Sequence, residues 1–284
     1  EDHIFKGQCP IFESKELIGK FYSEGEIKIS DITSDVNFSP NEYVIAKSYE
    51  DTSASFLGVV KEEKIVKLNC NLWDALDVNP RNKEQKFALD MLTRDDIPLV
   101  TMTGIAGSGK TFLTLMAAIS GLNKKKYDRI IITRSIQTVG KDIGFLPGTL
   151  QRKMEPWTRP LIDIFHKNYT VNRVGKMIRE EQIEIAPLAF MRGRTFENSY
   201  IIADEMQNTT INQFKMLITR IGEGSKLVIT GDLDQTDRGK ENGLHDFLQR
   251  LKKFNTQYIF DVALEAQDIQ RHHAVSEALE IYEV

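Results

Sequence analysis

The chain has 284 residues and a net charge of −4, with 37 lysines and arginines against 41 aspartates and glutamates. This length allows a large core and one or two domains, and the acidic balance gives no overall support for nucleic-acid binding, although a local basic surface is compatible with it. The two cysteines lack metal-ligand spacing and no apolar run reaches bilayer length, so the sequence indicates neither a cysteine metal site nor a membrane span.

The chain begins Glu1-Asp2-His3, which is polar and unlike a signal peptide. It lacks an initiator methionine, which indicates a processed or trimmed chain. We therefore expect a cytoplasmic protein in which Cys9 and Cys70 are reduced thiols.

The first 75 residues are rich in short β-like runs. These runs lie at residues 26–30, 43–46, 55–60 and 64–68. Alternating and β-branched residues of this kind predict a small antiparallel unit. The sequence Asn79-Pro80-Arg81-Asn82 then marks a break. We therefore predict a small β-rich domain at residues 1–75 and a second domain at residues 76–284.

Beyond this break, helical and strand patterns alternate. Helices are predicted at residues 83–94, 111–121, 150–166, 210–221, 241–254 and 274–282. Strands are predicted at residues 97–102, 129–133, 182–186, 199–203, 226–230 and 257–260. This alternation predicts an α/β fold with a mainly parallel, doubly wound sheet.

A phosphate-binding pattern, G-x-x-x-x-G-K-[ST], is matched by Gly104-Ile105-Ala106-Gly107-Ser108-Gly109-Lys110-Thr111. The string lies between a predicted strand and a predicted helix, which is the context that the motif requires. Its glycines let backbone N–H groups face a phosphate, and the helix N-terminus adds positive potential there. Lys110 is expected to reach the β- and γ-phosphates of ATP, and the Thr111 hydroxyl to hold Mg²⁺. The alternative is an ordinary glycine turn.

Two adjacent acids end the predicted strand at residues 199–203. Asp204 is placed to bind Mg²⁺, usually through water, and Glu205 to accept a proton from the attacking water or to orient it. An acidic pair at a strand end often only caps the next helix. This interpretation therefore depends on the phosphate-binding string at residues 104–111, which is called the P-loop.

A polar loop with a glutamine follows the predicted strand at residues 226–230. Ligands of open α/β sheets bind beyond the carboxyl ends of the strands. We therefore expect Gln235 to lie near the γ-phosphate, where it would sense hydrolysis. The alternative is a plain turn that contains Gly231 and Asp232.

From about Pro80 to Glu283 the chain resembles the PhoH family of P-loop ATPases, which are relatives of superfamily-one helicases. The resemblance rests on several blocks: Pro80-Arg81-Asn82 with Gln85, residues 104–111, Ile132-Thr133-Arg134, residues 139–148, residues 186–195, residues 204–208, Thr230-Gly231-Asp232 with Gln235 and Asp237, and Arg271-His272. The Gly-Phe-Leu-Pro-Gly and Met-Arg-Gly-Arg-Thr strings within them are specific to the family.

The resemblance implies a RecA-like fold, Mg²⁺-dependent ATP hydrolysis, and contact of Gln85 with adenine. Ser135 departs from the family pattern, because many members have proline there. Some members carry an N-terminal PIN nuclease domain. The roughly 75 residues before the ATPase are too few for one, so we expect no nuclease activity. The strands at residues 43–68 look like the segment that joins nuclease and ATPase in those relatives.

Superfamily-one helicases enclose ATP between two RecA-like halves, and this chain has room for one. A transition state that spreads charge over the γ-phosphoryl oxygens benefits from an arginine. We expect a neighbouring subunit to supply it in a ring, because repeated heterologous interfaces close into rings, and the resemblance also suggests homo-hexamers. The candidates are Arg271 first, then Arg220, Arg194 and Arg134, each of which has a surface ion pair as its alternative.

RNA or DNA is the expected partner of such a motor, and helicase activity is one expected outcome. Phe145 is a candidate to stack on a base, and Arg192 and Arg194 are candidates to hold phosphates. The alternative for Phe145 is that it anchors its own loop by packing. Two other functions stay open, a P-loop kinase that phosphorylates a small molecule and an ATP-binding scaffold with negligible turnover.

Overall fold

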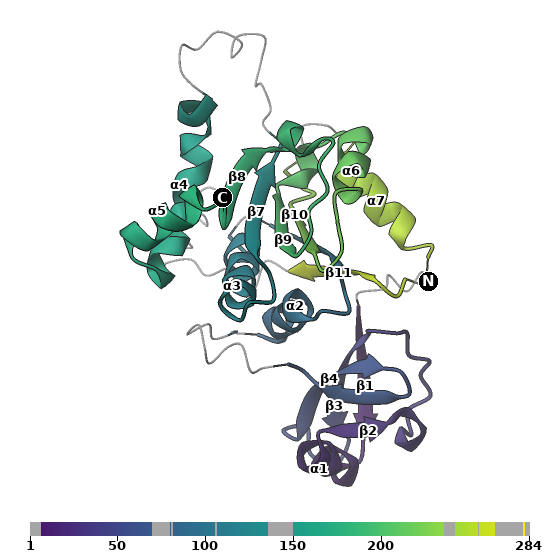
Figure 1. The fold of residues 1–284 in the computed structure, drawn as a ribbon. Helices are drawn as coiled ribbons and strands as arrows, with labels where there is room; N and C mark the ends of the chain where they lie inside the picture. The colour runs from purple at the N-terminus through teal and green to yellow at the C-terminus, as the bar shows by residue number, and fades with distance from the viewer. Residues whose placement is uncertain are drawn as a thin grey trace.

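The structure, a computed structural model, describes residues 7–69, 80, 82–105, 107–135, 150–235, 242–254, 256–264 and 281. These residues form two sheets, a small one near the N-terminus and a larger one that carries most of the helices (Figure 1). In the part of the chain that is described, no helix is both long and apolar enough to cross a membrane.

The small sheet has five strands in the order β1-β3-β4-β5-β2. Its elements are β1 (Gln8–Glu13), α1 (Lys15–Glu24), β2 (Glu26–Lys28), β3 (Tyr43–Ser48), β4 (Ser55–Lys61) and β5 (Lys64–Lys67). The four predicted strands are confirmed, but β1 and α1 were not predicted. The expectation of a purely antiparallel unit is also wrong, because β1 pairs with β3 in parallel. A parallel pair needs a crossover connection, and α1 and β2 lie within it.

The large sheet has six strands in the order β11-β6-β10-β9-β7-β8, and every neighbouring pair is parallel. The strands are β6 (Leu99–Gly104), β7 (Arg129–Arg134), β8 (Ile183–Pro187), β9 (Ser199–Asp204), β10 (Lys226–Gly231) and β11 (Ile259–Leu264). The predicted α/β class and parallel sheet are therefore confirmed.

Helices cover both faces of this sheet, which explains why its strands are continuous apolar runs. In β9, Tyr200 and Ile202 belong to one core with α2 (Lys83–Thr93) and α3 (Lys110–Asn123). Ile201 and Ala203 belong to a second core with α6 (Ile211–Ile218) and α7 (Gly243–Leu251). Alternate residues of one strand thus serve opposite layers (Figure 1).

The other α-helices within the described residues are α4 (Leu150–Asn168) and α5 (Val171–Arg179), of which α5 was not predicted. Helices α6 and α7 are shorter than predicted. The capping box of Thr210 and Gln213 sets the start of α6, and the Asn242 side chain caps α7. The predicted helix at residues 274–282 lies outside the described residues, apart from Ile281.

The small sheet packs against α2 (Figure 1). Tyr43 of β3 stacks on Phe87 with ring centroids 4.5 Å apart, and its hydroxyl donates to Oδ2 of Asp90 at 2.8 Å. Arg94, which follows α2, donates from Nη2 to Oδ1 of Asn41 at 2.6 Å. Tyr43 also meets the ring of Phe260 in β11 edge to face, so the small sheet has buried contacts with both α2 and the large sheet. The boundary at residues 75/76 stays a prediction, since residues 70–79 are outside the described part.

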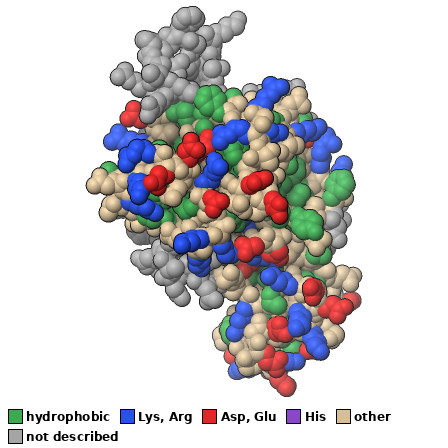
Figure 2. Space-filling view, in the orientation of Figure 1, with side chains coloured by type: hydrophobic (Ala, Val, Ile, Leu, Met, Phe, Trp, Pro, Cys, Tyr) green, Lys and Arg blue, Asp and Glu red, His purple; other side chains and the backbone are tan. Residues whose placement is uncertain are grey.

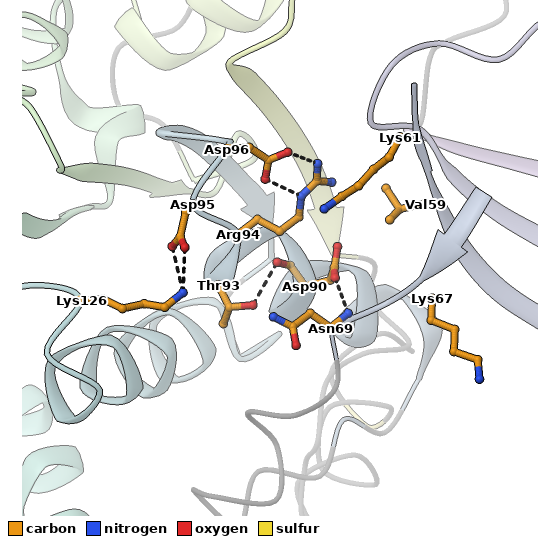
Figure 3. A pocket seen from close by; sticks show the side chains of 10 residues that line it. All are labelled: Val59, Lys61, Lys67, Asn69, Asp90, Thr93, Arg94, Asp95, Asp96 and Lys126. Carbon is orange, nitrogen blue, oxygen red and sulfur yellow. Dashed lines mark hydrogen bonds and ion pairs between the residues drawn. The ribbon is translucent and has the colours of Figure 1, made fainter. Parts of the chain in front are cut away.

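A cavity of about 380 Å³ lies at this seam. Figure 3 shows two ion pairs in its lining, with Lys61, Lys67 and Asp90 beside them. Arg94 donates to Asp96 at 2.9 and 2.5 Å, and Lys126 pairs with Asp95 at 2.9 Å. Among the described residues, four cationic and three anionic side chains line this cavity.

Candidate functional site

A second cavity, of about 280 Å³, lies where the carboxyl ends of β6, β9 and β10 meet. Parallel strands end at the same edge of a sheet, and ligands of α/β proteins bind beyond that edge. The lining residues come from the loop before α3, from the first turn of α3 and from the ends of β9 and β10 with the residues that follow them: Gly107, Gly109, Lys110, Thr111, Phe112, Asp204, Glu205, Gln207, Thr230, Gly231, Asp232 and Gln235.

The loop from β6 to α3 depends on its glycines. Gly107 and Gly109 have φ values of 84° and 88°, in the left-handed region that favours glycine. At Gly104 a Cβ atom would lie 2.6 Å from the carbonyl oxygen of Leu264. Lys110 follows directly as the first residue of α3. The loop thus has the strand–turn–helix context that its motif requires. Ala106 lies outside the described residues.

Lys110 folds back onto its own loop. Its Nζ donates to the carbonyl oxygens of Gly104 at 2.6 Å and Ile105 at 2.8 Å, and it lies 3.3 Å from Oγ of Ser108. Burial lowers the pKa of Lys110, against the opposing effect of the carboxylates of Asp232, Asp204 and Glu205. The ammonium group of Lys110 is therefore held at the cavity wall by hydrogen-bond acceptors that the oxygens of an anionic ligand can replace.

Asp204 and Thr111 are in direct contact, although 93 positions separate them in the sequence. Thr111 Oγ1 donates to Oδ1 of Asp204 at 3.2 Å, and Thr230 Oγ1 donates to the same oxygen at 2.7 Å. Asp204 is 7% exposed. A hydroxyl beside a carboxylate is a hard-oxygen donor set of the kind that Mg²⁺ prefers, so the residues present fit this ion.

Glu205 also lines the cavity, but its carboxylate is occupied by an arginine. Its backbone lies in the left-handed region, with φ 51° and ψ 47°. Oε2 of Glu205 accepts a hydrogen bond from Nη2 of Arg134, the last residue of β7. The sequence suggested Arg134 as a candidate to act on a neighbouring subunit, with an ion pair as its alternative, and the structure shows it in an ion pair with Glu205. The register that places Arg134 beside Asp204 is a long-range property, which local sequence patterns do not carry.

The end of β10 brings Gln235 to the cavity, as expected from its place beyond the strand. Sequence reasoning did not assign Asp232 and Gln207 to the site. Oε1 of Gln207 accepts from the backbone N–H of Asp232 at 3.2 Å, so the two strand ends are joined. Their positions just after β9 and β10 were the available signal. The sensor role of Gln235 stays a prediction.

Other predicted residues lie away from the cavity lining. Gln85 is buried in the first turn of α2. Arg194 donates to both carboxylate oxygens of Glu184 at 2.6 and 2.9 Å. Arg220 donates to the carbonyl oxygens of Met216 and Arg194 at 3.1 and 2.8 Å. Arg192 is exposed.

Phe145, Asp237, Arg271 and His272 lie outside the described residues. The predicted roles of Phe145 and Arg271 are therefore still predictions.

Comparison with known proteins shows that the chain matches a protein family. The model of the family described as "PhoH-like protein" matches residues 77–283. Protein PhoH2 of Bacillus subtilis is 33% identical over 265 residues, which cover 88% of this chain and 59% of the relative. A PhoH-like protein of Mycobacterium tuberculosis is 40% identical over 207 residues, covering 72% and 58%. Protein PhoH of Escherichia coli is 40% identical over 187 residues, covering 63% and 52%.

The chain spans somewhat more than half the length of these relatives. Because the family match starts at residue 77, a match that covers 88% of the chain must extend into the β-rich segment. PhoH2 of Bacillus subtilis therefore shares part of that segment. Among solved structures, the crystal structure of Pif1 helicase from Candida albicans aligns with a TM-score of 0.37 and 18% identity, over 71% of this chain and 43% of that one. This likeness is too low to indicate function.

Proposed function

The chain belongs to the PhoH-like family of P-loop proteins, and we propose that it is a Mg²⁺-dependent ATPase coupled to RNA or DNA binding, remodelling or unwinding. One observation carries the proposal. Lys110, the Thr111–Asp204 pair and Glu205 line a single cavity beyond the carboxyl ends of three parallel strands. A phosphate-binding cation, a set of magnesium ligands and a carboxylate base are the parts that phosphoryl transfer to water needs.

The loop and the start of α3 would receive the phosphates. Backbone N–H groups and the positive end of the α3 dipole favour an anion there. Lys110 would exchange the carbonyl oxygens of Gly104 and Ile105 for the β- and γ-phosphates. Mg²⁺, when bound by Thr111 and Asp204, would offset the phosphate charge.

Glu205 would accept a proton from the attacking water. The water oxygen bonds to the γ-phosphorus, the bond from that phosphorus to the β–γ bridging oxygen breaks, and ADP and inorganic phosphate leave. Gln235, which follows the neighbouring strand β10 at the same edge of the sheet, would orient this water or detect its reaction. A carboxylate base would serve water and an acceptor hydroxyl alike, so Gln235, which lines the same cavity and would orient water, is the residue that favours hydrolysis over the kinase alternative.

We propose that neighbouring subunits of a homo-hexameric ring complete the site. The intrachain hydrogen bonds of Arg194 and Arg220 engage these two candidates within their own subunit, so Arg271 remains our first candidate for the arginine in trans. The test is the native mass of the chain with ATP and Mg²⁺. A hexamer is expected, and a monomer under all conditions would contradict the shared site.

The coupling to nucleic acid rests on family membership and on the exposed Arg192. On the face shown in Figure 2, basic and acidic side chains are interspersed, so no broad basic field marks a binding track there. Phosphate release should be measured with ATP and Mg²⁺, with and without single-stranded RNA or DNA. Release that rises with either polymer supports the proposal. Transfer that requires a small-molecule hydroxyl would favour a kinase, and no release under any condition would favour a scaffold.

A further inference from the structure

An ion pair within one chain joins the proposed base to an arginine outside the cavity. Strands β7 and β9 are parallel neighbours, and their register sets Arg134 opposite Asp204. The guanidinium therefore reaches the next residue, Glu205, and Nη2 donates to Oε2. Glu205 lines the cavity, whereas Arg134 does not. Arg134 thus contacts the carboxylate of the proposed base without lining the cavity itself.

The backbone around Glu205 is held firmly. Asp204 ends a central strand, and Met206 and Gln207 are 0% and 2% exposed at the start of the short helix η4 (Met206–Asn208). Between them, Glu205 takes a left-handed conformation that side-chain-bearing residues adopt only where their surroundings impose it. These contacts fix where the Glu205 side chain starts.

The carboxylate itself has fewer constraints. The side chain of Glu205 is 41% exposed, against 28% for Arg134. A glutamate has three rotatable side-chain bonds, and an exposed one samples several rotamers. The pair with Arg134 is what selects one of them, because a guanidinium holds its donors in a rigid plane.

We propose that Arg134 is the positioning residue of Glu205 and acts within its own subunit. It holds Oε2 of the carboxylate, and Oε1 is then directed to take the proton of the attacking water. This follows the general arrangement in which a third group orients a catalytic base. The inference rests on the proposed function, because it needs Glu205 to act as that base. It also removes Arg134 from the arginines that would act across a subunit interface.

The first test compares Arg134→Ala and Arg134→Lys with the wild type in ATP-driven phosphate release. Loss of an orienting partner should lower kcat by about 10-fold or more, with KM and ATP affinity within about 2-fold. Arg134→Lys should recover part of kcat, since lysine supplies one donor without the plane. Arg250→Ala is the matched control. It breaks another arginine–carboxylate pair, with Asp246, on the exposed side of α7, and should leave kcat unchanged.

Combination with Glu205→Gln separates orientation of the base from a structural role. If Arg134 acts through Glu205, the double variant is no slower than Glu205→Gln alone. Full multiplication of the two losses, or an Arg134→Ala variant with normal kcat, would overturn the inference while the ATPase assignment stands. A wild type that releases no phosphate would overturn both.

A mixing experiment separates action in cis from action in trans. Arg134→Ala and Lys110→Ala subunits are combined, and native mass first shows that mixed particles form. Both residues serve the same cavity of the same chain, so no recovery of turnover is expected. Recovery would mean that Arg134 reaches a neighbour's site, and would contradict the inference.

Discussion

A buried lysine at the edge of the large sheet opposite the cavity holds the end of α2. Lys226 opens β10 and is 1% exposed. Its Nζ donates to the carbonyl oxygens of Met91 at 2.7 Å, Arg94 at 2.6 Å and Ile97 at 2.8 Å. The last carbonyl oxygens of a helix receive no hydrogen bond from an N–H group of the same helix. Lys226 therefore supplies a donor to carbonyl oxygens at the end of α2. Burial lowers the pKa of Lys226 to about 7.

We expect Lys226→Met to lower the free energy of unfolding by about 3 kcal/mol or more, since three buried carbonyl oxygens lose their donor at about 1–3 kcal/mol each and the removal of a buried charge offsets part of this. Guanidinium denaturation at pH 7 measures it, with Lys253→Met as an exposed control. A loss below about 1 kcal/mol would refute the reasoning, because it would mean that water satisfies these carbonyls. ATP affinity of the folded variant should be unchanged, as the cavity lies at the other end of β10.

The other predictions concern the cavity and its neighbouring strands. Glu205→Gln should bind ATP normally but hydrolyse it about 10²–10⁴-fold more slowly, and normal turnover would place the base elsewhere. Gly104→Ala should lower the unfolding free energy by about 1–3 kcal/mol, since its Cβ would lie 2.6 Å from a backbone oxygen; an unchanged melting curve would contradict this. Burial raises the pKa of Asp261 from 3.8 to about 6. The folded state therefore binds the proton of the Asp261 carboxyl group more tightly than the unfolded state does. The free energy of unfolding accordingly falls as the pH rises from about 4 to 6. Asp261→Asn should then be more stable than the wild type at pH 7–8 by up to about 3 kcal/mol, an upper bound because the side chain keeps some solvent contact. The gain should vanish near pH 4 in denaturant titrations, and a gain that does not change with pH would refute the assignment.

Local sequence patterns were enough to predict the strands of the large sheet, because these strands are buried on both faces. Within β7 and β9, residues 130–132 and 200–203 are apolar without interruption, and polar residues bound them. The same rule located the cavity, since the P-loop, Asp204 and Gln235 each follow a strand end. The donor set of Thr111 and Asp204 was predictable for this reason, despite their separation in sequence.

Short helices and long-range pairs were missed. Helix α5 had signals in its Thr170 cap and in Val174 and Met177, which lie three residues apart and are both buried, but it is short and directly follows the longer helix α4. Helix α1 had signals in its Ser14 cap and in Gly25 with φ 80°, but short β-like runs around it dominated the interpretation. The Arg134–Glu205 pair depends on which strands are neighbours and in what register, and no local window contains that information.

Phosphate release by the wild type and by Lys110→Ala, measured side by side with ATP and Mg²⁺, tests the central claim most directly. Lys110 contacts the loop and the cavity and is not part of either apolar core. The variant should therefore unfold at nearly the wild-type temperature and release no phosphate above background. Turnover by Lys110→Ala at a rate near that of the wild type would contradict the assignment of this cavity as the ATP site.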